Sequence, residues 1–308
     1  MNRVMNLILS SMFGEASPLR FDFQRSPPLS FMSALREKLV DAIRPLLVAG
    51  ARWGTPRLNL RDIDPVLVLG NQKTGSTAIA ELLAQYGDLW ATTDLHPLQS
   101  SAPQIENDPA FVARLIQRLR YYLRGDLIKE NELTVATDAL LEALPRARPV
   151  FVVRHPVQNV RSILDRLSLP GQPLPFERLG LSGNGWERIV RGHDYGIEAE
   201  NHITSLAVRW CRTAKIYLRH SERLHLVRYE DFVSDKLGTI SSLANQLGIQ
   251  QKKDIRPFLD VPFQPRGDNR ATPPQTFFSE QALDIIHNRC RREMDALDYE
   301  PILDSSAE

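Results

Sequence analysis

The sequence predicts a single α/β domain with a central parallel sheet flanked by helices on both faces. Two observations lead to this fold class. Short apolar runs, which are typical of buried strands, alternate with longer segments whose apolar residues recur at helical spacing. The 308 residues also contain no internal repeat and no linker that would divide the chain. Strands alternating with helices indicate parallel pairing, because each crossover between parallel strands carries a helix.

Composition and charge are those of an ordinary globular protein. The chain is 43% hydrophobic and 24% charged, with a net charge of +1. So small a net charge predicts no nucleic-acid partner, and any anion site must be local. No run is long enough to span a bilayer, and the first residues lack a clear signal-peptide cleavage site. Cys211 and Cys290 show no metal or disulfide spacing, so we expect a reduced, cytoplasmic protein.

The N-terminal part, residues 1–60, is expected to be an extension with one amphipathic helix packed on the core. The apolar residues at helical spacing in it are Phe31, Leu35, Leu39, Ile43, Leu46 and Leu47. Residues 61–308 form the main domain. Its first strand is 66–69, and a helix follows the glycine-containing loop after that strand.

The remaining elements follow in order. Asp108 and Pro109 start a helix within a helical insertion at 98–126, because aspartate caps helices and proline is favoured at the first helical position. Further strands are expected at 127–128, 149–153 and 224–227, and further helices at 137–144, 156–167, 197–220, 235–247 and 279–297. Residues 168–196 have glycines and prolines without periodicity, which predicts a long loop, and 261–276 form a basic loop.

The most informative segment is the loop 70–77, between an apolar strand and a helix. Such a loop presents backbone N–H groups and hydroxyls at a helix N-terminus, an arrangement that binds phosphate. Gly70 and Gly75 have the spacing of a nucleoside-triphosphate P-loop, but Ser76 stands where that motif has its lysine. The lysine lies inside the loop as Lys73. The alternative interpretation is an ordinary strand–helix turn without a ligand.

A second candidate anchor follows the strand 150–153. A magnesium-dependent kinase should carry an acidic residue on such a strand, but this one ends in Arg154 and His155. Ligands of open α/β sheets bind at the carboxyl ends of strands. Arg154 and Ser162, eight residues later on the next helix, could therefore converge on one anion. We interpret the two anchors as a metal-free phosphate site, and His155 as structural.

Four segments together resemble one known family, the PAPS-dependent sulfotransferases. Lys73-Thr74-Gly75-Ser76-Thr77 resembles their 5′-phosphosulfate loop, and Arg154-His155-Pro156 with Ser162 resembles their 3′-phosphate motif. Residues 226–232 look like the later strand of the family with its acidic end, and 290–299 are similar to the closing helix. The resemblance runs from about residue 65 to residue 300 in the family's order.

The resemblance implies a donor, a product and a set of binding residues. The donor would be 3′-phosphoadenosine 5′-phosphosulfate (PAPS), and its sulfuryl group would pass to a hydroxyl, or less favourably an amine, of a small-molecule, carbohydrate or lipid acceptor. The product would be 3′,5′-adenosine bisphosphate, and members of the family need no metal. Ala78 stands where many members have an aromatic residue, and the family's basic C-terminal loop has only a loose counterpart here. The implied cofactor-binding residues are Gln72, Lys73, Thr74, Gly75, Ser76, Thr77, Ala78, Arg154, Ser162, Arg266 and Gly267.

Three residues are candidates for the base that takes the acceptor's proton. Asp94 lies where several members of the family place a catalytic glutamate, although aspartate is one methylene shorter. His96, two residues on, is chemically suitable, and Glu130 follows Lys129 where cytosolic members carry Lys-x-His. Each also has a structural interpretation: a turn or cap for Asp94, a packed loop histidine for His96, and a surface pair for Glu130.

Two other function classes stay open from the sequence. One is a nucleotide kinase with an altered P-loop, and the other is a non-catalytic nucleotide-binding protein with this fold. The acceptor should be defined by residues 98–126 and 168–196, whose aromatic and arginine side chains fit several chemical classes. Nothing in the sequence predicts the oligomeric state.

Overall fold

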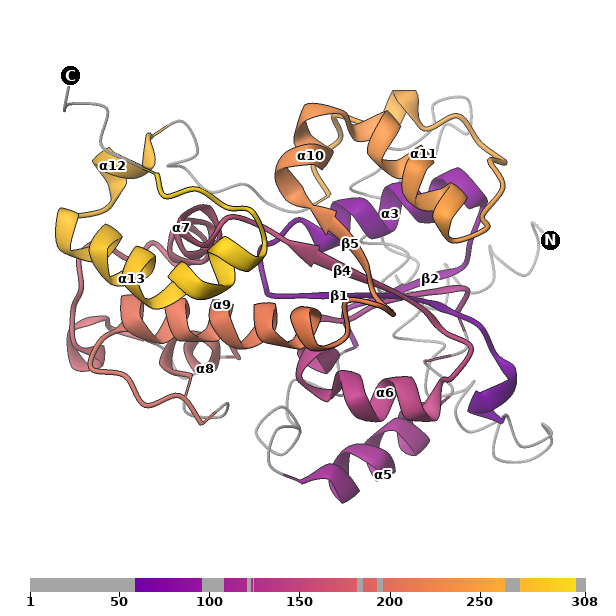
Figure 1. Cartoon of the computed structure of the whole chain (residues 1–308), viewed down its shortest axis with the longest axis horizontal. Helices are drawn as coiled ribbons and strands as arrows, with labels where there is room; N and C mark the ends of the chain where they lie inside the picture. The colour runs from indigo at the N-terminus through magenta and orange to yellow at the C-terminus, as the bar shows by residue number, and fades with distance from the viewer. Residues whose placement is uncertain are drawn as a thin grey trace, which may run out of the picture. The chain divides into compact units, whose positions relative to one another are not determined.

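Five parallel strands form the centre of the structure, a computed structural model that describes residues 59–95, 108–120, 123, 125–181, 185–192, 196–263 and 272–302. The strands are β1 (Val66–Gly70), β2 (Ala91–Thr93), β3 (Leu127–Lys129), β4 (Arg148–Val153) and β5 (His225–Arg228). Their order in the sheet is β2-β3-β1-β4-β5, and each neighbouring pair is parallel (Figure 1). The predicted α/β class with a parallel sheet is thereby confirmed.

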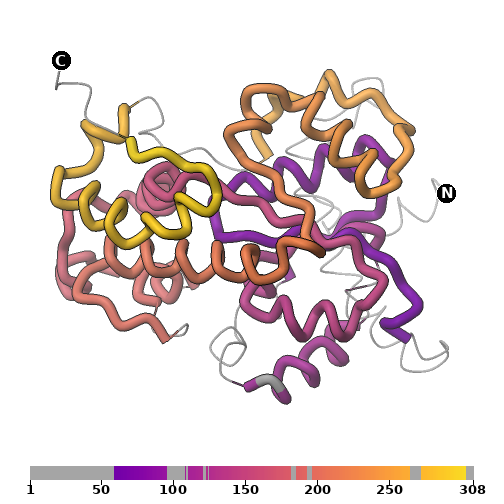
Figure 2. The backbone as a smooth tube through the Cα atoms, in the orientation of Figure 1, coloured from indigo at the N-terminus to yellow at the C-terminus, as the bar shows by residue number. Residues whose placement is uncertain are grey.

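Helices connect the strands and cover both faces of the sheet, as the backbone trace in Figure 2 shows. The α-helices are α3 (Ser76–Gly87), α5 (Pro109–Leu119), α6 (Thr137–Ala143), α7 (Pro156–Arg166), α8 (Gly185–Arg191), α9 (His202–Arg219), α10 (Tyr229–Ser234), α11 (Lys236–Gln246), α12 (Pro274–Phe277) and α13 (Glu280–Ala296). Short 3₁₀ turns are η1 (Leu60–Asp62), η4 (Asn131–Ala136), η5 (Phe176–Arg178) and η7 (Arg256–Phe258).

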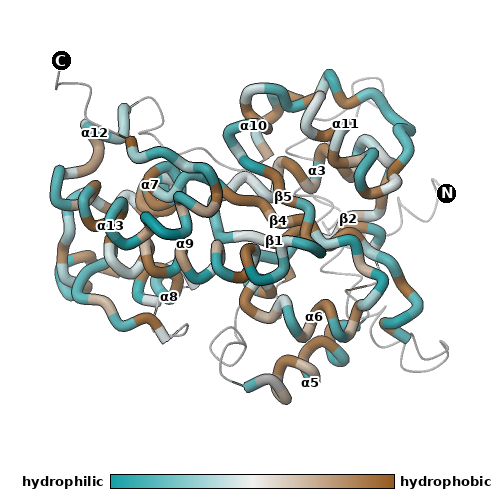
Figure 3. The backbone as a smooth tube through the Cα atoms, in the orientation of Figure 1, coloured by the Kyte–Doolittle hydropathy of each residue, from teal (hydrophilic) through white to brown (hydrophobic). Residues whose placement is uncertain are grey.

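The two faces of the sheet bury alternate residues of the same strands. On β1, Val66 and Val68 belong to one buried apolar cluster, which also contains residues of α3 and α11. Leu67 and Leu69 belong to the other cluster, with residues of α6, α7, α9 and α13. Successive side chains of a strand point to opposite faces, so a strand covered on both sides must be apolar throughout. β4 meets this requirement and is hydrophobic along most of its length (Figure 3).

Helix caps account for most of the predicted helix starts. The Asp108 carboxylate accepts a hydrogen bond from the Phe111 N–H, and Asp235 caps α11 in the same way through the Gly238 N–H. The predicted start of α9 near residue 197 was five residues too early. Asn201 caps this helix by accepting from the Thr204 N–H, and α9 therefore begins at His202.

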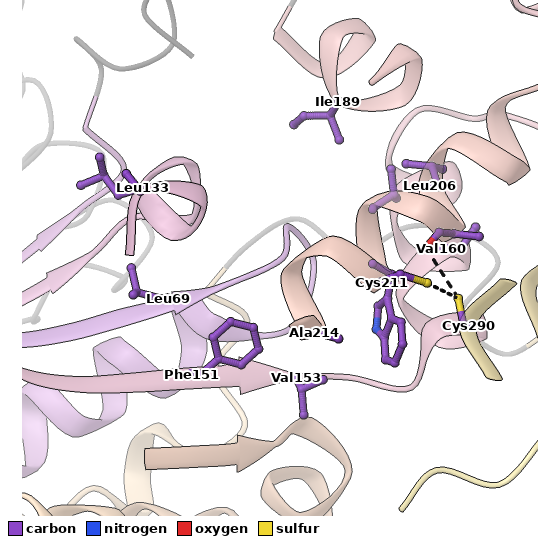
Figure 4. Packing of buried hydrophobic residues seen from close by; sticks show 14 of the residues in the cluster. Leu69, Leu133, Phe151, Val153, Val160, Ile189, Leu206, Cys211, Ala214 and Cys290 are labelled. Carbon is purple, nitrogen blue, oxygen red and sulfur yellow. Dashed lines mark hydrogen bonds between the residues drawn. The ribbon is translucent and has the colours of Figure 1, made fainter. Parts of the chain in front are cut away.

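α9 and α13 pack side by side and bring the two cysteines together (Figure 4). The Cys211 and Cys290 sulfur atoms lie 3.6 Å apart, and both residues are buried free thiols. Burial raises the pKa of the Cys290 thiol well above its ordinary value, so the thiol form is favoured. The spacing of the two cysteines predicted neither a disulfide nor a metal site, and their adjacency could not be predicted from residues so far apart in the chain.

Some predicted boundaries were wrong. The segment 168–196 is not one long loop, because it contains η5 and the seven-residue helix α8, whose Ile189 and Val190 are buried in the core. β2 and α10, of three and six residues, are too short to produce a periodic pattern. The predicted N-terminal helix lies outside the described residues. Within the described ranges, no helix has the length and apolar character needed to cross a membrane.

Candidate functional site

The glycine loop lies between the carboxyl end of β1 and the first turn of α3. Gly70, Lys73 and Gly75 have positive φ angles of 146°, 64° and 89°. A Cβ on Gly70 would lie 2.4 Å from the Val152 carbonyl oxygen, so only glycine fits there. Gly75 is the N-cap of α3 and has no side chain to satisfy the first N–H groups of the helix. The loop therefore has the geometry of an anion cradle at a helix N-terminus.

Buried polar side chains hold the loop from behind. Arg209 of α9 donates to the Asn71 Oδ1 atom at 3.0 Å and to the Gln72 Oε1 atom at 2.6 Å. The Gln72 amide in turn donates to the Glu132 carboxylate at 3.2 Å. Gln72 was predicted to bind the cofactor, but its side chain is buried and occupied by these partners. Its side chain therefore supports the loop.

The two predicted phosphate anchors lie in contact. Arg154, at the end of β4, donates a 3.3 Å hydrogen bond to the main-chain carbonyl of Lys73. The Arg154 guanidinium also lies 4.4 Å from the centre of the Tyr229 ring. Ser162 is half-buried on α7, the helix that follows Arg154. The structure therefore joins the loop to the end of β4 through Arg154.

Positive charge is concentrated at Lys73. The pKa of Lys73 is lowered from its ordinary value by burial first, and then by the charges of Arg166 and Arg154. Asp165 has the opposite effect on this pKa. Neighbouring positive charges repel one another, so an anion bound beside them would be stabilised.

A second polar cluster lies at the carboxyl ends of β2 and β3. The ammonium of Lys129, only 4% exposed, forms a 2.5 Å ion pair with the Asp94 carboxylate, which is 56% exposed. Next to this pair, Glu130 is buried and accepts hydrogen bonds from the N–H groups of Leu95 and Glu132. Burial raises the pKa of Glu130 to about 7. The alternative interpretation of Lys129 and Glu130 as a surface pair does not hold, since both are buried and Lys129 pairs with Asp94.

This cluster is connected to the loop through η4, the turn after β3. The Ser76 hydroxyl donates to the Asn131 Oδ1 atom at 3.2 Å, and the Thr134 hydroxyl donates to the Gly70 carbonyl at 3.0 Å. Asp94 and Glu130 therefore share one edge of the sheet with the anion cradle. The other predicted site residues, His96, Arg266 and Gly267, lie outside the described residues.

The two weaker sequence motifs contact each other. The Tyr299 hydroxyl donates to the Glu230 carboxylate at 2.9 Å, and the other oxygen of Glu230 accepts from the His155 N–H. The His155 Nδ1 atom accepts from the Val157 N–H, so its Nε2 atom carries the proton and donates to the Glu300 carbonyl. Burial lowers the pKa of His155. His155 therefore caps α7, in line with the structural role expected from the sequence.

Several residues of the site were not found from the sequence. Asn131 was not selected, although it follows Lys129 and Glu130 in a segment that was. Asn159 and Arg209 are each one of several polar residues in an amphipathic helix and give no signal of their own. Tyr229 belongs to a segment that the sequence did single out, but its contact with Gly75 could not be predicted. A Cβ on Gly75 would lie 2.3 Å from the Tyr229 ring.

Comparisons with known proteins match part of the chain to one family model. Residues 113–253 match the model of the sulfotransferase family. No curated protein matches the sequence. Similar solved structures include a sulfotransferase domain from the curacin biosynthetic pathway, with 16% identity, a TM-score of 0.44, and coverage of 80% of this chain and 99% of that one. The sulfotransferase STF9 from Mycobacterium avium has 14% identity, a TM-score of 0.46 and coverage of 86% and 81%.

A third similar structure, retinol dehydratase in a complex with retinol and PAP, has 15% identity, a TM-score of 0.39, and coverage of 79% of this chain and 86% of that one. The segment that matches the family model contains Glu130, Arg154 and Ser162, and it begins after the loop of Lys73 and after Asp94. The match agrees with the resemblance noted from the sequence over residues 113–253, which are less than half of the chain.

Proposed function

We propose that the protein transfers a sulfuryl group from 3′-phosphoadenosine 5′-phosphosulfate to a hydroxyl, less favourably an amine, of a small-molecule, carbohydrate or lipid acceptor. The observation that carries this proposal is the contact between Arg154 and Lys73. It brings the cations of two separate sequence motifs to one edge of the sheet, as a donor with phosphate groups at both ends of its ribose requires. The lowered pKa of Lys73, to which Arg154 and Arg166 contribute, adds support for an anion there.

Each end of the donor has its own binding residues in this proposal. The Lys73 ammonium and the first N–H groups of α3 bind the 5′-phosphosulfate, with Thr74, Ser76 and Thr77 supplying backbone groups or hydroxyls. Arg154 and Ser162 bind the 3′-phosphate, which distinguishes this donor from ATP. Ala78 presents only its backbone. Arg266 and Gly267 remain candidates for further contacts with the 3′-phosphate.

The chemical step requires charge stabilisation and one proton acceptor. A bond forms between the acceptor oxygen and sulfur as the bond from sulfur to the 5′-phosphate oxygen breaks. Lys73 stabilises the negative charge that develops on that leaving oxygen. The acceptor's proton passes to a carboxylate, for which Asp94 is the first candidate. The Oδ1 atom of Asp94 pairs with Lys129. Its Oδ2 atom has no partner among the described residues and could take the proton.

Two variants test the proposal at its two anchors. Lys73→Ala and Arg154→Ala should each lower sulfuryl transfer to any acceptor about a hundredfold or more, because each removes a charge from the site. Lys253→Ala, a surface lysine paired with Asp88 at 2.6 Å, is the matched control and should keep full activity. Calorimetry should also detect binding of 3′,5′-adenosine bisphosphate in the absence of magnesium. Wild-type turnover in either anchor variant, or no binding at all, would contradict the proposal.

The same experiments separate the other two function classes. The P-loop spacing of Gly70 and Gly75 favours a nucleotide kinase as the second candidate. Magnesium-dependent ATP hydrolysis that is lost in Lys73→Ala would support that kinase. Tight binding of 3′,5′-adenosine bisphosphate without transfer to a broad panel of hydroxyl and amine acceptors would support a non-catalytic binding protein.

A further inference from the structure

Asn159 of α7 connects the two anchors of the site, and we infer that it locks the loop 70–76 to α7 as one rigid unit. Asn159 is a positioning residue in this view. Its effect on ligand affinity rests on the proposed function, because it requires a donor with phosphates at both ends. The contacts behind it come from the described residues alone. Neither a sequence motif nor the chemistry of transfer accounts for an amide at this position.

Both ends of the Asn159 amide bind the loop. Its Nδ2 atom donates to the main-chain carbonyl of Gln72 at 2.8 Å. Its Oδ1 atom accepts from the Nδ2 atom of Asn71, also at 2.8 Å. Asn159 is completely buried. One side chain therefore holds two consecutive loop residues that directly precede Lys73.

The surroundings of Asn159 favour a role other than packing. On the same helix, Val160 and Ile163 are fully buried in the apolar core. An amide buried there must have hydrogen-bond partners, because a buried polar group without them destabilises the fold. An apolar side chain would fill the position without this requirement. The presence of asparagine therefore points to the two hydrogen bonds that it makes.

The loop is also held by a second helix, α9. The Asn71 Oδ1 atom accepts from Arg209 at 3.0 Å and from the Gln72 N–H at 3.0 Å. The Asn71 main-chain carbonyl accepts from the Thr74 hydroxyl at 2.9 Å. Because the Asn71 oxygen is already used in this way, its amide nitrogen is directed to Asn159. The loop is thus hydrogen-bonded to both α7 and α9.

Three successive loop residues are consequently held from the side of β4 and α7. Asn159 binds Asn71 and Gln72, and Arg154 binds the carbonyl of Lys73. Arg154 and Ser162 also hold the proposed 3′-phosphate. The distance between the two phosphate positions is then set before any ligand binds, which lowers the ordering cost of a ligand that needs both.

The test compares two nucleotides that differ only in the 3′-phosphate. Calorimetry gives the affinities of wild type and Asn159→Leu for 3′,5′-adenosine bisphosphate and for adenosine 5′-monophosphate. We expect the preference for the bisphosphate to shrink about tenfold in Asn159→Leu, the equivalent of one lost hydrogen bond between protein groups. Thr213→Val is the matched control: it removes a buried hydrogen bond to the Trp210 carbonyl on α9 without touching the loop. It should leave the preference unchanged.

Hydrogen exchange of the ligand-free protein provides a second readout. Amides 71–76 should exchange about tenfold faster in Asn159→Leu, while in Thr213→Val they should exchange as in wild type. If Asn159→Leu does not fold, Asn71→Asp replaces it in both experiments. That variant keeps an oxygen for Arg209 but lacks the N–H that Asn159 accepts.

The outcomes are distinguishable. An unchanged preference and unchanged loop exchange in a folded variant would overturn the inference while leaving the proposed function intact. If wild type binds neither nucleotide, the proposed function fails, and hydrogen exchange alone decides whether Asn159 locks the loop. An equal loss of affinity for both nucleotides with unchanged loop exchange would indicate a merely structural role and would also overturn the inference.

Discussion

Gly75 lies directly against the ring of Tyr229. A Cβ at this glycine would be 2.3 Å from Cδ2 and 2.4 Å from Cε2 of that ring, and the φ of Gly75 is +89°. The same ring lies 4.4 Å from the Arg154 guanidinium. Tyr229 therefore connects the loop to the strand-end arginine by packing, in addition to the hydrogen bond between Arg154 and Lys73.

Gly75→Ala should consequently be among the most damaging single-methyl changes in the loop. The added Cβ overlaps an aromatic ring that is fixed by its neighbours, and the residue must keep a left-handed backbone. We expect a loss of about 2–4 kcal/mol in the free energy of unfolding, measured by urea denaturation. Gly248→Ala is the control, because Gly248 has a φ of +67° with nothing within 4 Å of its Cβ position. It should lose about 1 kcal/mol; equal losses would show that Tyr229 does not restrict the loop.

The buried carboxyl of Glu130 should make the stability of the protein depend on pH. Burial raises its pKa from 4.5 to about 7 in the folded protein. A raised folded-state pKa means that the contribution to stability is fully present below the unfolded pKa of 4.5 and is lost as the pH rises through about 7. The free energy of unfolding should therefore fall by about 3 kcal/mol over that window because of this group.

Glu130→Gln removes the titration and should flatten this part of the stability curve. Urea denaturation of both proteins across the same window measures the difference. Glu142→Gln, at an exposed position of α6, should leave the slope of wild type unchanged. A Glu130→Gln curve parallel to that of wild type would contradict the assignment of the slope to Glu130.

The sequence predicted the fold well, for a clear physical reason. Strands such as β1 and β4 are buried on both faces and are therefore continuously apolar, and helices such as α7 begin at prolines or capping residues. These signals are local. The errors occurred where local signals are weak, as in the seven-residue helix α8 and the three-residue strand β2. Pairing across the chain, as between Cys211 and Cys290, produces no local signal.

The candidate site was predictable in its charged residues and not in its supporting ones. Lys73 and Arg154 were identified because they stand at strand ends with glycine and proline beside them, which are the positions where ligands bind. Asn159 and Arg209 hold the residues just before Lys73, but each is one of several polar residues in an amphipathic helix. Glu130 stays a candidate, and its burial contradicts the alternative interpretation of a surface pair.

Lys73 should make anion binding depend on pH at the alkaline end. Its pKa is lowered by burial and by Arg166 and Arg154, so Lys73 loses its charge at a lower pH than an ordinary lysine. A bound phosphate stabilises the charged form, so affinity is highest below this pKa and falls as the pH rises through it. Calorimetry with 3′,5′-adenosine bisphosphate between neutral pH and about pH 10 measures this loss. In Lys73→Met the affinity should be lower and no longer change over this range, and a decline equal to that of wild type would assign the titration to another group.

Asp94 should be required for the rate of transfer rather than for donor binding. Its carboxylate is exposed and held by Lys129 through one oxygen, and it shares a sheet edge with the anion cradle. Asp94→Asn keeps the size of the side chain and removes its basicity, so kcat should fall about a hundredfold or more. The dissociation constant for 3′,5′-adenosine bisphosphate should stay within about twofold of wild type, because Asp94 binds neither phosphate in the proposed arrangement. Steady-state kinetics of Asp94→Asn, His96→Ala and Glu130→Gln in parallel identify the base, and a wild-type kcat in Asp94→Asn would exclude Asp94 and leave His96 and Glu130.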